Sequence, residues 1–206
     1  MSKSEGTIFI ISGPVVTAVG MEAGMYDVVR VGHEGLMGVV IELHGVKAVI
    51  QVYEDTSGIR PGEPVLNTKE TLSVALGPGL LTQIYDGIQR PLATLEEVMG
   101  VFITRGVDAD AFDLDKKWTF EPTVKAGETV VSGQCIGEVQ ETETIRHKIM
   151  IPPGKGGVVK SIESGDFNVI ETVCMLDDGT EIQMMQKWPV RTPRPYQQKY
   201  APDTPL

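Results

Sequence analysis

The sequence predicts a mainly β protein with a small N-terminal β-barrel, a short helical connector and a second β-rich lobe. Three observations lead to this fold class. Short apolar runs rich in Val and Ile are separated every few residues by some of the 23 glycines and 13 prolines, a rhythm typical of strands joined by tight turns. This rhythm occupies two separate stretches of the 206 residues. The stretch between them is the one that places apolar residues at helical spacing.

Residues 1–73 are expected to form the barrel. Two apolar runs flank His44-Gly45-Val46-Lys47, which predicts a hairpin whose Gly45 takes a positive φ. An extended Gly- and Pro-containing loop is expected at residues 58–64. Five or six strands in about 70 residues favour a closed barrel, because closure removes exposed sheet edges. The predicted strands are residues 7–11, 15–19, 26–31, 39–43 and 48–52.

Residues 74–115 are expected to form the connector. Leu81, Ile84 and Ile88 recur at helical spacing, and the pattern resumes from Leu92 to Met99 after Pro91. The spacing predicts two short helices with a break at the proline, since proline cannot continue a helix through its interior. A Gly- and Asp-rich connection at residues 101–115 then leads to the second lobe.

Residues 116–189 are expected to form the second lobe. Its short apolar runs are punctuated by glycine at positions such as Gly127, Gly133 and Gly137, and a polar hairpin separates residues 136–139 from residues 149–151. This order resembles the barrel-sandwich-like β fold of biotinyl and lipoyl carrier domains. Residues 190–206 are rich in proline, which predicts an extended, semi-rigid linker.

Composition excludes several classes of function. The formal net charge is -10, and the chain has no Lys- or Arg-rich run to neutralise phosphates, which argues against nucleic acid or an anionic membrane surface as partner. Cys135 and Cys174 lie far apart and outside any CxxC motif, so neither a zinc knuckle nor a disulfide framework is predicted. The apolar run at residues 8–11 is too short for a signal peptide or membrane helix. The expected location is cytoplasmic.

Two segments resemble known kinds of site, one for a nucleotide phosphate and one for a covalently attached group. Residues 154–157 (Gly-Lys-Gly-Gly) lack both the earlier glycine and the following hydroxyl of a nucleotide-phosphate loop, so a flexible turn is predicted there. A carrier domain would present a modifiable lysine at the tip of its hairpin. That tip falls at residues 143–145, whereas Lys148 falls within the run entering the next strand.

Acidic and histidine residues also lack the spacing of a site. Asp108, Asp110, Asp113 and Asp115 form an acidic ladder, but the sixth and twelfth positions of a helix-loop-helix calcium loop are not Gly and Glu. The three histidines His33, His44 and His147 show no ligand spacing, and the adjacent pairs Glu54-Asp55 and Glu96-Glu97 point apart. These patterns therefore predict no catalytic, no cofactor-binding and no metal-binding residue.

One run is too particular to be generic turn chemistry. Residues 77–92 read GPGLLTQIYDGIQRPL, which closely resembles the catalytic A subunit of V-type and A-type rotary ATPases. Further motifs of that family follow in order across effectively the whole chain. They are Gly13-Pro14-Val15-Val16, residues 25–32, the run AVIQVYEDTSGIRPGEPV at residues 48–65, Arg105-Gly106-Val107-Asp108, Trp118 with Phe120 and Pro122, and residues 188–196 from Trp-Pro-Val-Arg to Pro-Tyr.

The resemblance implies which part of the catalytic subunit this chain forms. The chain resembles the N-terminal region of that catalytic subunit, which ends before the nucleotide-binding phosphate loop, so the ATP and Mg of the full-length parent would bind in a later part. Residues 7–65 would form a barrel in a hexameric collar with neighbouring A and B subunits, and residues 116–189 the bulge, or non-homologous region, facing the peripheral stalk. Residues 77–91 would thread the barrel to the central domain. The parent would couple ATP hydrolysis or synthesis to proton or sodium transport while attached indirectly to the membrane.

Three hypotheses remain open. The first is an inactive N-terminal portion of the catalytic A subunit that serves assembly. The second is a free-standing adaptor or regulatory β protein that competes for the same subunit contacts. The third is a carrier domain modified on Lys148.

Overall fold

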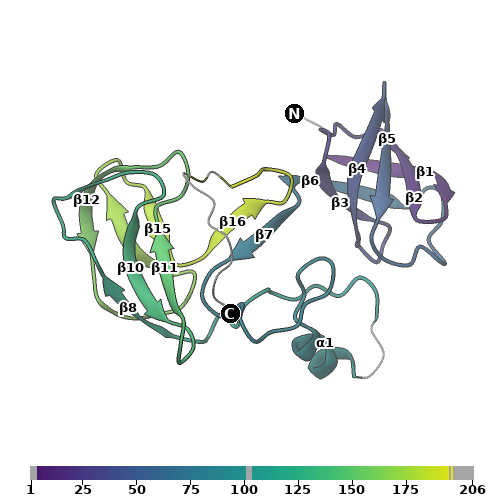
Figure 1. Ribbon diagram of the computed structural model, residues 1–206. Helices are drawn as coiled ribbons and strands as arrows, with labels where there is room; N and C mark the ends of the chain where they lie inside the picture. The colour runs from purple at the N-terminus through teal and green to yellow at the C-terminus, as the bar shows by residue number, and fades with distance from the viewer. Residues whose placement is uncertain (1–3, 101–103, 195, 197–206) are drawn as a thin grey trace. The chain divides into compact units, whose positions relative to one another are not determined.

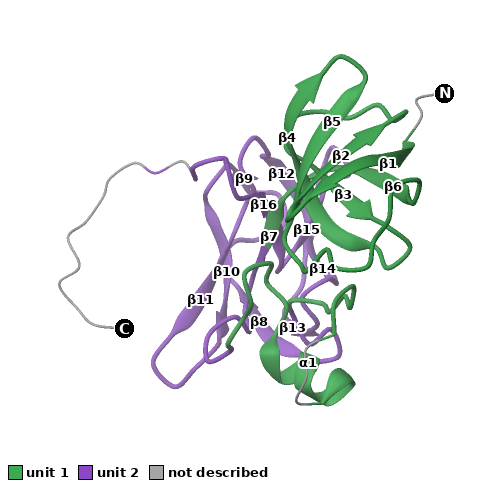
Figure 2. Cartoon of the chain, turned by 90° about the vertical axis from the view of Figure 1, so that its right-hand side faces the viewer, with its two compact units in different colours: residues 1–74, 84–111 green, residues 75–83, 112–206 purple. Residues whose placement is uncertain are grey.

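The computed structural model describes residues 4–100, 104–194 and 196 (Figure 1). The chain divides into two compact units (Figure 2). The first comprises residues 1–74 and 84–111, and the second comprises residues 75–83 and 112–206. The predicted fold class is confirmed, because nearly all regular structure is β and one short helix lies in the connector.

The first unit contains a closed six-stranded barrel with the strand order β1-β2-β5-β4-β3-β6. Every neighbouring pair is antiparallel. Closure pairs β1 with β6, so no strand of the barrel keeps an open edge. The strands are β1 (Glu5–Ser12), β2 (Val15–Val19), β3 (Asp27–Val31), β4 (Leu36–His44), β5 (Lys47–Val52) and β6 (Pro64–Thr71).

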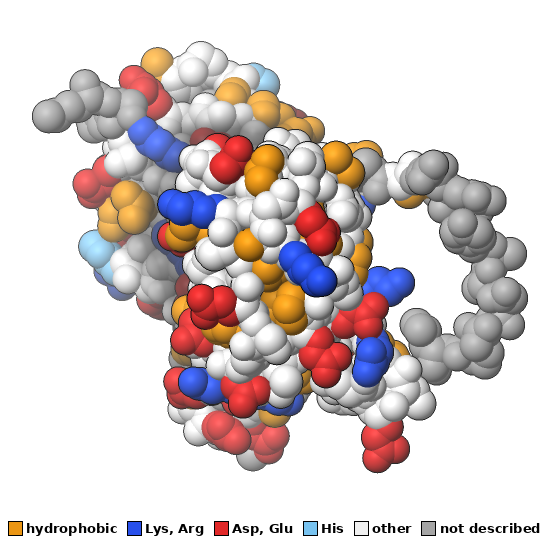
Figure 3. All heavy atoms as spheres, turned by 90° about the vertical axis from the view of Figure 1, so that its left-hand side faces the viewer, with side chains coloured by type: hydrophobic (Ala, Val, Ile, Leu, Met, Phe, Trp, Pro, Cys, Tyr) orange, Lys and Arg blue, Asp and Glu red, His pale blue; other side chains and the backbone are white. Residues whose placement is uncertain are grey.

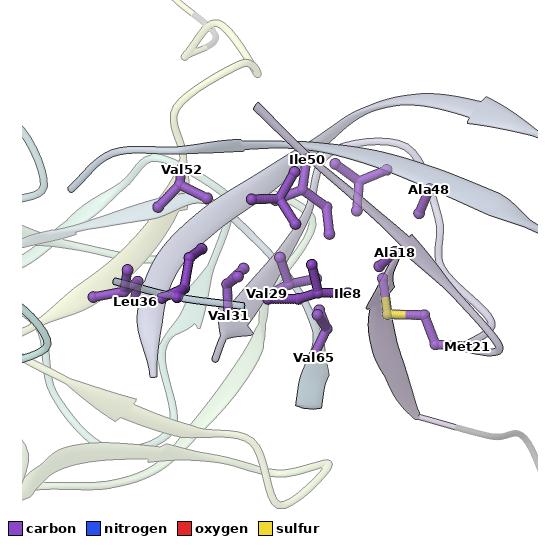
Figure 4. Packing of buried hydrophobic residues seen from close by; sticks show 13 residues of the cluster. Ile8, Ala18, Met21, Val29, Val31, Leu36, Ala48, Ile50, Val52 and Val65 are labelled. Atoms are coloured by element: carbon purple, nitrogen blue, oxygen red, sulfur yellow. The ribbon is translucent and has the colours of Figure 1, made fainter. Parts of the chain in front are cut away.

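Alternating side chains of these strands fill the barrel. Val16, Val29 and Ile50 are fully buried and come from three different strands. Figure 4 shows such side chains converging on the interior from opposite walls of the barrel. Burying each of them contributes about 1.5–3 kcal/mol. The period-2 pattern of the sequence therefore stabilises the closed barrel, because it directs these side chains into the interior.

Two local features of the barrel arise from turn chemistry and register. The predicted hairpin forms between β4 and β5, and Gly45 at its tip has a φ of 60°. In β1 the register with β2 shifts between Ile8 and Ile10, which marks a β-bulge. The bulge breaks the alternation, so that Phe9 and Ile10 are both about half exposed.

The connector contains one of the two predicted helices. Helix α1 (Leu92–Met99) follows Pro91 and ends at Gly100, which has a φ of 74°. The helix predicted at residues 81–88 is wrong. Residues 84–92 instead form a hairpin-like turn, in which Asp86 N–H donates to the Arg90 carbonyl and Leu92 N–H donates to the Ile84 carbonyl.

The turn forms because the side chain of Asp86 competes for the backbone donors that a helix would use. Asp86 Oδ1 accepts hydrogen bonds from the N–H groups of Ile88 and Arg90, at 3.0 and 2.9 Å. Short polar side chains of this kind favour turns over helix interiors. Part of the predicted connection, residues 101–103, lies outside the described residues.

The second unit is built from two four-stranded sheets, with the orders β11-β10-β8-β13 and β15-β14-β12-β9 (Figure 2). A further two-stranded sheet joins β16 to β7 (Ser73–Leu76), the second half of which belongs to this unit. The other strands are β8 (Trp118–Pro122), β9 (Thr129–Val130), β10 (Cys135–Gln140), β11 (Arg146–Met150), β12 (Gly157–Ile162), β13 (Gly165–Phe167), β14 (Thr172–Leu176), β15 (Glu181–Gln183) and β16 (Gln186–Pro189).

The core of the second unit includes Phe120, Ile136 and Leu176, which are fully buried. The predicted polar hairpin is the turn between β10 and β11, closed by a hydrogen bond from Glu141 N–H to the Ile145 carbonyl.

On the face of the molecule that Figure 3 presents, acidic and basic side chains are interspersed. The predicted proline-rich linker lies mostly at residues 195 and 197–206, outside the described residues.

Candidate functional site

The first unit contains a cluster of charged side chains with little exposure, which we call the Arg90 cluster. It consists of Arg90, Glu54 and Asp86. The side chains of Arg90 and Glu54 are each 8% exposed, and that of Asp86 is 19% exposed. Arg90 Nε donates to Asp86 Oδ2 over 2.7 Å, and one terminal nitrogen donates to the Val107 carbonyl over 2.6 Å. The same nitrogen lies 3.5 Å from Glu54 Oε2. Arg90 therefore joins three chain segments of the unit.

Backbone donors complete the Arg90 cluster. Glu54 Oε2 accepts a 2.7 Å hydrogen bond from Gly106 N–H, and Glu54 Oε1 accepts one of 3.3 Å from Met37 N–H. Burial raises the pKa of Asp86, but hydrogen bonds from Arg90 and Ile88 and the charge of Arg90 outweigh burial, so the pKa lies below its usual value. Backbone N–H dipoles thus supplement the single guanidinium in stabilising the Asp86 carboxylate.

Exposed ion pairs surround this cluster. Arg105 Nε lies 2.6 Å from Glu34 Oε2, and its guanidinium also donates to the carbonyl groups of Asp55 and Ser57. Arg30 pairs with Asp108 in the same unit. These contacts fasten Arg90, Arg105 and Asp108 of the connector to residues of the barrel.

The second unit contains a separate buried carboxylate, Glu141, whose side chain is 2% exposed. Glu141 Oε1 accepts hydrogen bonds from Gly79 N–H at 2.6 Å and from Leu81 N–H at 3.2 Å. Glu141 Oε2 lies 2.9 Å from His147 Nδ1. Two backbone N–H donors and one imidazole nitrogen therefore converge on a carboxylate that water hardly reaches.

The exposed apolar side chains of the barrel include those of Phe9, Ile10, Leu43 and Val46. Their exposed fractions are 48%, 50%, 39% and 79%. Leu43 and Val46 line a shallow groove of about 440 Å³, together with residues 20–23, 45, 47 and 48. The Nζ atom of Lys47 lies 4.7 Å from the centroid of the Phe9 ring, which links the groove to the bulge of β1. Exposed apolar side chains that share a groove, as Leu43 and Val46 do, are typical of protein-protein contacts.

The Gly-Lys-Gly-Gly segment lies at a turn that leads into a strand. Residues 152–155 form the turn, in which Lys155 N–H donates to the Pro152 carbonyl, and strand β12 follows, whereas a phosphate loop leads into a helix whose N–H groups face the phosphates. Lys155 is exposed, and the Gly156 position faces the backbone of Val130 and Val131. The turn predicted for this segment is therefore present.

The structure places the other candidate residues apart. Lys148 lies within β11 opposite Glu138, away from the hairpin tip. Asp113 accepts hydrogen bonds from the N–H groups of Asp115 and Lys116, so it stabilises a turn. Within the part of the chain that is described, no three His, Cys, Asp or Glu side chains are grouped to hold a metal ion, and no helix is long and apolar enough to cross a bilayer.

The sequence patterns predict neither the Arg90 cluster nor the contacts of Glu141. Glu54 lies just after strand β5, yet its partners Arg90 and Gly106 lie 36 and 52 residues further along the chain. Glu141 stands out in the sequence only as part of a polar hairpin, although its donors lie about 60 residues earlier. The one available signal is the Asp86-Gly87 pair followed by Arg90, which predicts a turn fastened by an ion pair.

Comparison with known protein families agrees with this architecture. Residues 8–69 match the beta-barrel domain of the ATP synthase alpha/beta family, and residues 109–191 match the ATP synthase alpha/beta subunit barrel-sandwich domain. The two matches cover the barrel and the second β lobe in turn. The chain belongs to the ATP synthase alpha/beta family.

Relatives within the ATP synthase alpha/beta family share most of this chain's length. The chain is 60% identical over 207 residues to the A subunit of the A-type ATP synthase of Methanocorpusculum labreanum, covering 100% of this chain and 36% of that protein. It is 58% identical over 202 residues to the A subunit of the A-type ATP synthase of Methanosarcina barkeri, covering 98% of this chain and 35% of that protein. The chain thus spans about a third of the length of these relatives, at their N-terminal side.

Proposed function

We propose that this chain is the N-terminal portion of the A subunit of an A-type ATP synthase. The observation that carries the proposal is the identity of 58–60% across essentially the whole chain to proteins of that name. The complete protein would couple ATP synthesis or hydrolysis to proton or sodium transport, as part of a sector attached to the membrane through other subunits. In the complete protein, ATP and Mg would be bound by residues beyond this chain.

Within that protein, the portion described here would serve assembly. Residues 1–73 would form a collar with neighbouring A and B subunits, residues 74–115 would begin the central domain, and residues 116–189 would form the bulge directed at peripheral stalk subunits. The groove lined by Leu43 and Val46 supports the first of these roles, since single exposed apolar residues are common but exposed apolar residues that share a groove are typical of protein contacts.

The first test is the size of the endogenous protein, measured with an antibody raised against this chain. A band about three times the mass of this chain is expected, because the chain spans 35–36% of its relatives. A native band at 22.4 kDa would contradict the proposal and favour a free-standing adaptor that competes for the same contacts. ATP hydrolysis by the purified 206-residue chain would contradict its proposed inactivity.

The second test addresses the assembly surface. Full-length protein carrying Val46→Glu should co-purify less of the B subunit than wild type does, because the substitution places a charge in the apolar groove. Val131→Glu is the matched control, since Val131 is also a well-exposed valine, at 63%, but lies in the second unit. Equal recovery of the B subunit with wild type and Val46→Glu would show that the groove does not contact it.

A further inference from the structure

We infer that Glu141 is a latch that fastens a strap of chain, residues 77–81, onto the β10–β11 hairpin of the second unit. The inference goes beyond the proposed function, because it concerns how one family-specific segment is held and does not depend on the identity of the whole protein. All of its parts lie in the second unit.

The chemistry of the carboxylate supports a latch. The Glu141 side chain is nearly inaccessible to water, so its two oxygens rely on the three protein groups that reach them. Two of those groups, the N–H groups of Gly79 and Leu81, belong to the strap. Hydrogen bonds to an ionised acceptor are stronger than those between neutral groups. If the strap detached, the Glu141 carboxylate would keep His147 as its remaining described partner. The free energy of the two lost hydrogen bonds therefore stabilises the attached strap.

The conformation of the strap is shaped for this contact. Gly79 has a φ of 107°, a region that favours glycine, and a Cβ atom there would lie 3.2 Å from Trp118 Cζ2. A Cβ atom on Gly77 would lie 3.2 Å from the Met184 carbonyl oxygen. Both glycines therefore let the backbone approach the lobe closely enough for Gly79 N–H to reach the carboxylate.

Burial changes sharply at the end of the strap. Gly77 and Pro78 are buried, whereas residues 81–84 are exposed, with Ile84 at 71%. The second unit gives way to the first unit after residue 83. The latch thus lies next to the end of the first segment of the second unit, and opening it would release residues 77–81 from the lobe.

Amide hydrogen exchange of the full chain, resolved by residue, tests the latch. In Glu141→Gln the Gly79 and Leu81 amides should exchange about tenfold faster than in wild type, because a neutral amide replaces the charged acceptor. Glu141→Asp keeps the charge on a side chain one methylene shorter, and it should give an intermediate rate. Glu143→Gln is the matched control, since Glu143 is exposed in the same hairpin and its substitution should leave both rates unchanged.

Two results would overturn the latch. Unchanged exchange at Gly79 and Leu81 in both Glu141 variants would show that the strap is held by packing alone. Equal acceleration across β10, β11 and the strap would give Glu141 a general stabilising role. If Glu141→Gln does not fold, Glu141→Asp decides between these outcomes, because acceleration confined to the strap supports the latch and uniform acceleration refutes it.

Discussion

Replacing Arg90 with methionine should loosen the first unit and leave the second unaffected. Methionine keeps much of the apolar stem but removes the donors to Asp86 and to the Val107 carbonyl, as well as the charge beside Glu54. Glu54 and Asp86 would then be two carboxylates, 8% and 19% exposed, with no cation between them. Removing one partner of a buried ion pair costs about 3–5 kcal/mol. With an m-value of about 2 kcal/mol/M, the urea midpoint of the first unit should fall by about 2 M.

The two units offer separate readouts for this variant. Both tryptophans, Trp118 and Trp188, lie in the second unit, so their fluorescence follows that unit alone. The first unit is followed by urea-dependent hydrogen exchange of barrel amides and of residues 84–100. Arg60→Met is the control, because Arg60 is exposed on a loop of the barrel and its loss should cost little. A loss below about 1 kcal/mol, the level expected of a surface pair, would refute the reasoning.

Three further predictions concern other parts of the chain. Gly137→Ala should destabilise the second unit by about 1–3 kcal/mol, because its Cβ atom would lie 2.2 Å from Phe120 Cε2; unchanged unfolding followed by tryptophan fluorescence would contradict this. In native protein a thiol reagent should label Cys135 before Cys174, since Cys174 is 1% exposed and burial raises its thiol pKa; equal labelling rates by mass spectrometry would be the opposite result. The folded pKa of Asp86 is lowered, so the contribution of Asp86 to stability is present above its ordinary pKa and is lost as pH falls from about 4 through the folded value. Asp86→Asn should therefore flatten the acid dependence of stability in urea titrations of the first unit. An unchanged dependence on pH would argue against this prediction.

Local patterns predict the strands well and one helix badly. The alternation of buried residues in β2 and the turn at Gly45 are properties of a few consecutive residues, so they can be read directly. The helical spacing of Leu81, Ile84 and Ile88 misleads because the same stretch contains Asp86, whose carboxylate binds nearby N–H groups. In a short segment, such side-chain hydrogen bonds outweigh apolar periodicity.

Strand alternation, glycine and proline turns and the run at residues 77–92 are all local, so they are enough to predict the fold class and the family. How that run is held depends on contacts between segments far apart in the chain. Asp86 and Arg90 fasten its later part to the first unit through Glu54, 36 residues away from Arg90, whereas Gly79 is held in the second unit by Glu141, 62 residues away. A buried carboxylate takes whichever donors the closed fold brings within hydrogen-bond distance, and no periodicity along the chain encodes such pairings.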